Sequence, residues 1–176
     1  MQRFATWLAM LAGALLVPAL LVPTMRAAAD PLPASQSATI LGPTNPLLSE
    51  GSQALEAGRF EEGVRLTLAG LELPTSAHDQ AAGHSNICAG YAALKRWTDA
   101  LEHCNRALEL DNTNWRTYNN RAAVFVGLKM FDLAMTDVNA GLEIAPNSAT
   151  LRKSREVVVQ HENASRRERW RKPKKA

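Results

Sequence analysis

The side chains of this sequence that are best suited to chemistry are two cysteines and two histidines in its middle third. Cys88 and Cys104 are the only cysteines of the chain, and they flank Lys95-Arg96 at similar distances. If the segments on either side of Lys95-Arg96 form an antiparallel helix pair, the two cysteines lie opposite one another. In an oxidising compartment they could form a disulfide. The alternative is a pair of buried thiols that fill space as small apolar side chains do.

The same region also offers side chains that bind metals. His84 and Cys88 are four residues apart and share one face of a helix, and His103 is adjacent to Cys104. Zinc sites are commonly built from four such nitrogen and sulfur ligands. Adjacent residues point in different directions on a helix, however, which opposes a joint site. We therefore predict no metal site and interpret both histidines as polar surface residues.

No arrangement of catalytic residues stands out in the sequence. No glycine-rich phosphate-binding loop follows a strand, because no strand is predicted. Serine, histidine and aspartate all occur, but their spacing singles out no pair of nucleophile and base. We therefore expect a protein that is not an enzyme and that uses no cofactor.

The composition favours a small helical protein with an uneven distribution of charge. The chain has 176 residues and is 46% hydrophobic, which suits a single domain rich in leucine and alanine. Its net charge of +3 hides an asymmetry. Residues 30–151 carry 14 acidic and 8 basic side chains, whereas residues 152–176 carry 10 basic and 3 acidic ones. The body of the protein is thus acidic and its C-terminal end is basic.

The first thirty residues have the organisation of a secretory signal of bacterial type. Met1-Gln2-Arg3 is a short basic start, residues 4–25 are largely apolar, and Ala27-Ala28-Ala29 places small residues before Asp30. This order is that of a cleavable signal peptide. We expect cleavage after residue 29 and export to the periplasm. The alternative is an uncleaved inner-membrane anchor facing the periplasm, because the apolar run is just long enough to span a bilayer.

A period of about 34 residues runs through the rest of the chain. The triplets Gly58-Arg59-Phe60, Lys95-Arg96-Trp97 and Lys129-Met130-Phe131 each end in an aromatic residue and each predict a turn. The second and third are 34 residues apart, and the first and second are 37 apart. Small and apolar residues follow each triplet at matching, helical distances. Because a single helix pair cannot bury its apolar face alone, neighbouring pairs are expected to stack.

These residues resemble the tetratricopeptide repeat, a helix-turn-helix unit with small and aromatic residues at fixed positions. The resemblance covers roughly residues 44–148 and is clearest over 115–148. It is weaker in the first unit, where Thr67 takes a large position, and Asn112 replaces the closing proline of the second. The resemblance implies an all-α fold, a short α-solenoid of three repeats with a C-terminal capping helix.

The chain is therefore expected to consist of five consecutive parts. Residues before the repeats are rich in proline, serine and threonine, which is typical of a linker without fixed structure. The signal peptide, linker, repeat domain, capping helix and basic tail are predicted at residues 1–29, 30–45, 46–148, 149–165 and 166–176. Within the repeat domain, the three repeats are predicted at about 44–77, 81–114 and 115–148.

The resemblance also implies where a partner would bind. In tetratricopeptide domains, the first helix of each repeat lines a groove for a peptide or a partner helix. The matching polar positions here are Asn86, Arg116, Asn119 and Asn120. Part of this set resembles the subclass that grips a peptide C-terminal carboxylate, although the first-repeat residues of that subclass are absent. We expect a non-catalytic adaptor of the cell envelope that binds another protein or peptide, unless these are ordinary solvated positions.

The basic tail is a second candidate for contact with a partner. From Arg166 to Lys175 the sequence interleaves arginine and lysine with Trp170. This pattern suits anionic lipid headgroups or nucleic acid, and export argues against nucleic acid. Contact with the acidic body and a tail that serves only solubility are the alternatives. Together with an uncleaved N-terminal helix, the tail supports a second function, that of a membrane-associated envelope assembly factor.

Overall fold

The computed structural model describes residues 45–171, and this part of the chain forms seven α-helices and no strand. The predicted signal peptide, nearly all of the predicted linker and residues 172–176 lie outside the described residues. The helices are α1 (Pro46–Glu56), α2 (Phe60–Leu71), α3 (Ala77–Ala93), α4 (Trp97–Leu110), α5 (Trp115–Gly127), α6 (Phe131–Ile144) and α7 (Ala149–Arg171). None of these helices is long and apolar enough to cross a bilayer.

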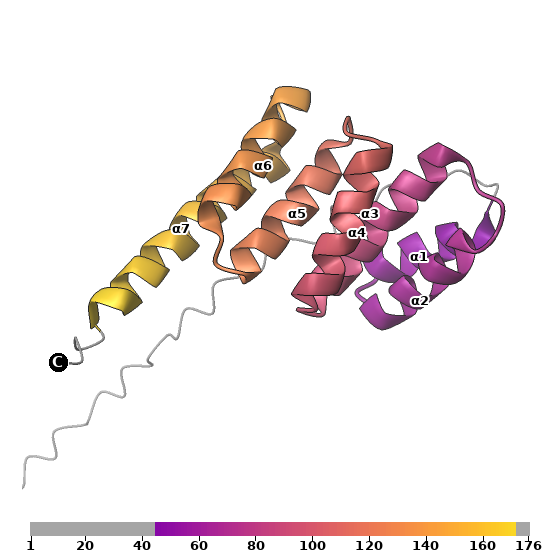
Figure 1. Ribbon diagram of the computed structural model, residues 1–176, viewed down its shortest axis with the longest axis horizontal. Helices are drawn as coiled ribbons and strands as arrows, with labels where there is room; N and C mark the ends of the chain where they lie inside the picture. The colour runs from indigo at the N-terminus through magenta and orange to yellow at the C-terminus, as the bar shows by residue number, and fades with distance from the viewer. Residues whose placement is uncertain (1–44, 172–176) are drawn as a thin grey trace, which may run out of the picture.

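The helices are arranged as a row of stacked pairs in chain order (Figure 1). The pairs α1/α2, α3/α4 and α5/α6 follow one another, and α7 packs against α6 and α5 at the end of the row. The first helices of consecutive pairs also contact one another, α1 with α3 and α3 with α5. The predicted all-α solenoid of three repeats with a C-terminal capping helix is confirmed.

One type of turn joins the two helices of every pair. Gly58, Lys95 and Lys129 adopt the left-handed conformation, with φ of 75°, 58° and 62°. In all three turns, the N–H of the following residue donates to the carbonyl oxygen five positions earlier. This arrangement closes the first helix and reverses the chain direction. The triplets recognised in the sequence are therefore the three turns, although two of them place lysine where glycine is less strained.

Each helix pair has a small core that the next unit completes. Ile87 of α3 packs with Leu55 and Val64 of the first pair. Val124 of α5 packs against the cysteines of the second pair, and Val158 of α7 packs into the core of the third. All three completing side chains are fully buried. Stacking therefore supplies each pair with apolar contacts that it cannot make alone.

The capping helix α7 is longer than the sequence predicted. Ser148 caps its start, because its Oγ accepts a hydrogen bond of 3.3 Å from the N–H of Leu151. The helix continues past the predicted end at residue 165 to Arg171. No proline or glycine interrupts residues 149–171, and Arg166 pairs with Glu162 one turn earlier, at 2.6 Å. Residues 166–171 of the predicted tail are thus helical.

Candidate functional site

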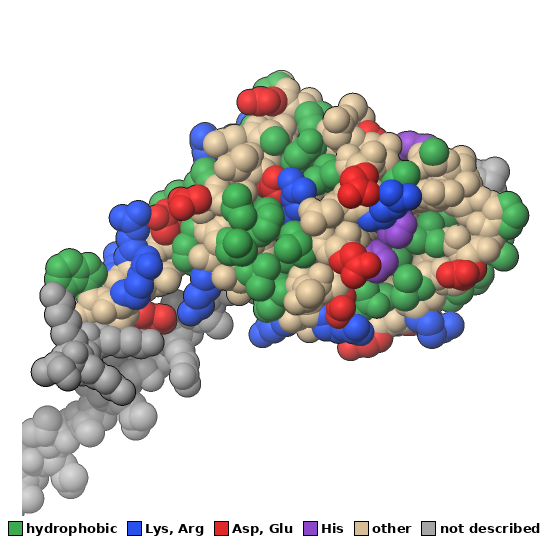
Figure 2. Space-filling view, in the orientation of Figure 1, with side chains coloured by type: hydrophobic (Ala, Val, Ile, Leu, Met, Phe, Trp, Pro, Cys, Tyr) green, Lys and Arg blue, Asp and Glu red, His purple; other side chains and the backbone are tan. Residues whose placement is uncertain are grey.

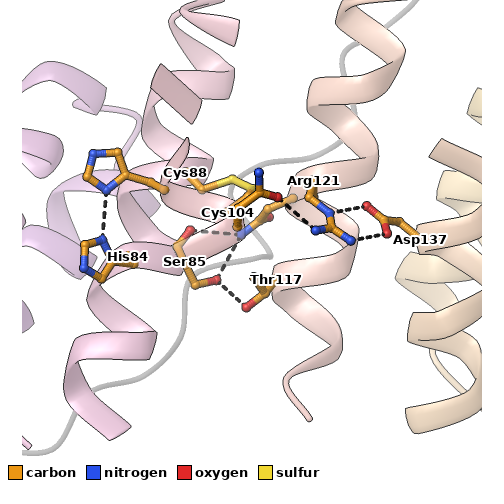
Figure 3. The surroundings of a disulfide bond; sticks show 10 residues. His84, Ser85, Cys88, Cys104, Thr117, Arg121 and Asp137 are labelled. Carbon is orange, nitrogen blue, oxygen red and sulfur yellow. Dashed lines mark hydrogen bonds and ion pairs between the residues drawn. A yellow bond between two sulfur atoms is a disulfide. The ribbon is translucent and has the colours of Figure 1, made fainter. Parts of the chain in front are cut away.

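A disulfide joins α3 and α4 inside the middle helix pair (Figure 3). It links Cys88 and Cys104, whose Cα atoms are 5.2 Å apart. Both side chains are buried, and Ala92, Ala100 and Val124 pack around them. The antiparallel register about Lys95-Arg96 therefore places the two cysteines opposite one another.

Two histidines face each other beside this disulfide (Figure 3). The Nδ1 atoms of His84 on α3 and His103 on α4 are 2.9 Å apart, and the ring of Tyr91 lies 5.7 Å from that of His103. Because two protonated nitrogens cannot share one hydrogen bond, at least one ring must be neutral. Burial, followed by the charges of His103 and Arg106, lowers the pKa of His84 to about 4. Burial also lowers the pKa of His103.

The interpretation of both histidines as surface residues was therefore wrong, since both rings are half-buried and paired. His84 and Cys88 also do not share a metal, because the sulfur of Cys88 is bonded to Cys104. Within residues 45–171, no three His, Cys, Asp or Glu side chains are grouped closely enough to hold a metal ion.

A row of buried polar side chains connects the first helices of consecutive repeats, and we call it the polar seam. The hydroxyl of Thr117 on α5 donates to Oγ of Ser85 on α3 at 2.9 Å (Figure 3). Asn120 donates to the carbonyl oxygen of Ser85 at 3.2 Å. Ser154 of α7 donates to Oδ1 of Asn119 at 2.6 Å. The polar seam thus fixes α3 to α5 and α5 to α7.

Three of the four predicted partner-binding residues are buried amides. Asn86, Asn119 and Asn120 are 0%, 1% and 3% exposed. Asn119 and Asn120 belong to the polar seam, a role that the sequence reasoning missed. Its signal in the sequence is that Ser85 and Asn120 lie 35 residues apart, about one repeat. Direct contact of these amides with a partner stays a prediction, and it would require them to become uncovered.

Arg116, the fourth predicted residue, is placed differently. It is only partly buried at the start of α5, and its guanidinium lies 4.6 Å from the centre of the Trp115 ring. Its Nε is shielded from solvent and has no hydrogen-bond partner among the described residues. A guanidinium commonly binds a carboxylate through two parallel N–H groups. The Nε of Arg116 is therefore a donor that no described residue uses, and it must be uncovered before an anionic group can reach it.

Arg121 forms an ion pair within the third repeat and a hydrogen bond to the second repeat, neither of which the sequence reasoning found. Arg121 of α5 donates from Nε and Nη2 to the two carboxylate oxygens of Asp137 on α6, both at 2.8 Å (Figure 3). Its Nη1 donates to Oδ1 of Asn105 on α4 at 2.9 Å. Asp137 is only 4% exposed. This two-pronged contact uses the charge of Arg121 within the fold, and it leaves Arg116 as the arginine of α5 without such a partner.

Comparisons with known sequences give short, partial matches, and no family model matches the chain. The chain is 30% identical over 106 residues to sperm-associated antigen 1 of Mus musculus, a match that covers 60% of this chain and 11% of that protein. It is 33% identical over 67 residues to peptidyl-prolyl cis-trans isomerase FKBP4 of Homo sapiens, covering 38% and 15% of the two chains. The match thus spans only a small part of these relatives.

Comparisons with solved structures cover more of the chain. The first TPR domain of human RPAP3 is similar with a TM-score of 0.61 and 21% identity, over 69% of this chain and 93% of that one. The Sgt2 TPR domain of Aspergillus fumigatus gives a TM-score of 0.60 and 18% identity, over 85% of this chain and 91% of that one. The Arabidopsis OM64 TPR domain gives a TM-score of 0.60 and 19% identity, over 75% of this chain and 99% of that one. The described residues therefore have the fold of a tetratricopeptide-repeat domain.

The disulfide predicts the result of a thiol titration. We expect no free thiols in the denatured, unreduced protein. Replacing both Cys88 and Cys104 by alanine should lower the free energy of unfolding by about 3 kcal/mol, because the bond closes a loop with a sequence separation of 16. Urea denaturation measures this change, and the reduced wild-type protein is the control. Two free thiols in the unreduced protein would contradict the pairing.

The histidine pair predicts a pH dependence of stability. The pKa of His84 lies at about 4 in the folded state, against an ordinary value of 6.5. Between these values the unfolded chain binds more protons, so this group lowers the stability as the pH falls through that window. We expect His84→Gln to reduce this loss in urea denaturation from pH 7 to pH 4.5. The exposed His78 provides the control, and an equal effect of His78→Gln would reject the assignment.

Proposed function

We propose that the stacked repeats bind a peptide or an extended segment of a partner protein, and that Arg116 receives a carboxylate of that partner. Two solved structures with the same fold support a peptide ligand. The first TPR of Spaghetti (RPAP3), with a TM-score of 0.58 and 22% identity, is bound to the HSP90 peptide SRMEEVD. The second TPR domain of human RPAP3, with a TM-score of 0.57 and 15% identity, is in complex with the HSP70 peptide SGPTIEEVD. Both peptide sequences are acidic and end in aspartate.

The observation that carries this proposal is the state of the Arg116 guanidinium. Its Nε is shielded from water and unpaired, which costs free energy. A ligand supplies the missing acceptor once the guanidinium turns toward the surface. Trp115 limits the motion of the guanidinium by stacking against it at 4.6 Å. A carboxylate would complete this arrangement with two charge-assisted hydrogen bonds.

The first repeat restricts which peptides would fit. Helix α1 contains no lysine or arginine and carries Glu50 and Glu56. Its two positions that match the basic and amide residues of carboxylate-binding repeats hold Leu48 and Ser52, and both are buried. We infer that the ligand carries one recognised carboxylate near α5 and neutral or basic residues toward α1. A run of acidic side chains would be repelled at that end.

The proposed site of action is the cell envelope. This part of the proposal rests on the signal-like order of residues 1–29 and on an exported compartment that would preserve the disulfide. Retention of an uncleaved segment would instead make the protein a membrane-anchored assembly factor. N-terminal sequencing of the exported protein separates the two, because cleavage gives a chain that starts at Asp30.

Binding to peptides selected from a library with free C-termini tests the role of Arg116. We expect Arg116→Ala to weaken the best peptide by about 10-fold or more, because a hydrogen bond to a charged group contributes about 1.5–3 kcal/mol. Fluorescence polarisation with labelled peptides measures the affinity. Arg106→Ala is the matched control, since Arg106 is an exposed arginine of α4 that pairs with Glu109.

A second form of the ligand identifies the carboxylate. If Arg116 binds the terminal carboxylate, amidation of that terminus should weaken binding to the wild type and leave binding to Arg116→Ala unchanged. If Arg116 binds a side-chain carboxylate, replacing that Asp or Glu of the peptide should weaken binding to the wild type and leave binding to Arg116→Ala unchanged. Equal affinities of the wild type and Arg116→Ala for every selected peptide would reject the site.

A further inference from the structure

The last turns of α7 extend beyond the repeats. The buried residues of α7 end at Val158. His161 and Glu162 are still partly buried, and the last turns then project past α5 and α6 (Figure 1), with basic side chains gathered on them (Figure 2). Most side chains from residue 163 to residue 171 are exposed. These turns therefore add little to the core of the solenoid.

The exposed turns carry a one-sided pattern, which we call the arginine–tryptophan stripe. Its members recur at the spacing that places helical residues on one face, and they are Asn163, Arg166, Arg167, Trp170 and Arg171. Trp170 is 90% exposed. The exposed Val159 extends the stripe one turn toward the body. Glu168 is the one acidic residue from residue 163 to residue 171, against four arginines.

We propose that the arginine–tryptophan stripe binds the surface of an anionic lipid bilayer. Arginines attract anionic headgroups, and tryptophan favours the boundary between headgroups and acyl chains. A bilayer needs only a row of cations and an interfacial aromatic side chain, both of which a single projecting helix can present. A folded protein partner would need a matching concave surface. This inference concerns a different helix end from Arg116 and does not depend on the peptide proposal.

Vesicle binding by the full chain tests this inference. The apolar residues 1–29 could enter any bilayer, so the readout is the ratio of partitioning into mixed phosphatidylglycerol–phosphatidylcholine vesicles and into pure phosphatidylcholine vesicles. We expect the wild type to prefer the anionic vesicles at low salt and to lose this preference at high salt. The double variant Arg167→Glu/Arg171→Glu should reduce the ratio by at least about 20-fold, because each basic side chain near such a surface contributes about fivefold.

Two further variants separate the stripe from a general charge effect. Arg169→Glu makes the same charge change on the other side of the same turns, so it should reduce the ratio less than Arg167→Glu. Subtracting the fluorescence spectrum of Trp170→Phe from that of the wild type gives the emission of Trp170. The maximum of this emission should shift to shorter wavelength when anionic vesicles are added. All of these side chains are exposed, and thermal unfolding checks that each variant folds.

Three outcomes would overturn the inference. One is equal partitioning of the wild type into the two kinds of vesicle. Another is an equal loss with Arg169→Glu and Arg167→Glu. The third is binding to polyglutamate without any preference for anionic vesicles, which would assign the stripe to an acidic protein partner.

Discussion

The cores of the helix pairs are incomplete until the next unit supplies one side chain. Ile87, Val124 and Val158 pack into three successive cores, and each is fully buried. The third of these belongs to α7, which has no second helix of its own among the described residues. The last repeat therefore needs the capping helix to complete its core. The projecting end of α7 is held in place because the start of the same helix is packed there.

The polar seam adds specificity to this stacking. Apolar contacts tolerate some sliding, whereas a buried hydrogen bond such as that between Thr117 and Ser85 is satisfied in one register only. The ion pair between Arg121 and Asp137 has the same effect within the third repeat and, through Asn105, on its boundary with the second. Most buried polar groups are thus used by the fold, and the exceptions among the described residues are Nε of Arg116 and Nε2 of His161.

The features that were predictable from the sequence are those that depend on local pattern. The turns at Gly58, Lys95 and Lys129 and the cap at Ser148 each involve residues close in the chain. The polar seam, the His84–His103 pair and the Arg121–Asp137 ion pair join side chains 16 to 35 positions apart. Their formation depends on how far each helix is rotated about its axis, and hydrophobic periodicity fixes that rotation only within a broad stripe. The extent of α7 was underestimated because residues 166–171 were assigned to a separate basic tail, whereas they continue the helix.

The disulfide between Cys88 and Cys104 lies wholly inside one helix pair and crosses no boundary between repeats. Tension applied to the two ends of the chain is therefore resisted at the boundaries by packing and hydrogen bonds alone. Once those contacts separate, most of the chain can extend. The segment between Cys88 and Cys104, with a sequence separation of 16, cannot extend because the disulfide closes it. The fully extended chain is therefore shorter by about 50 Å. Under tension, the middle helix pair would remain a closed, compact segment, and the chain would extend on both sides of it.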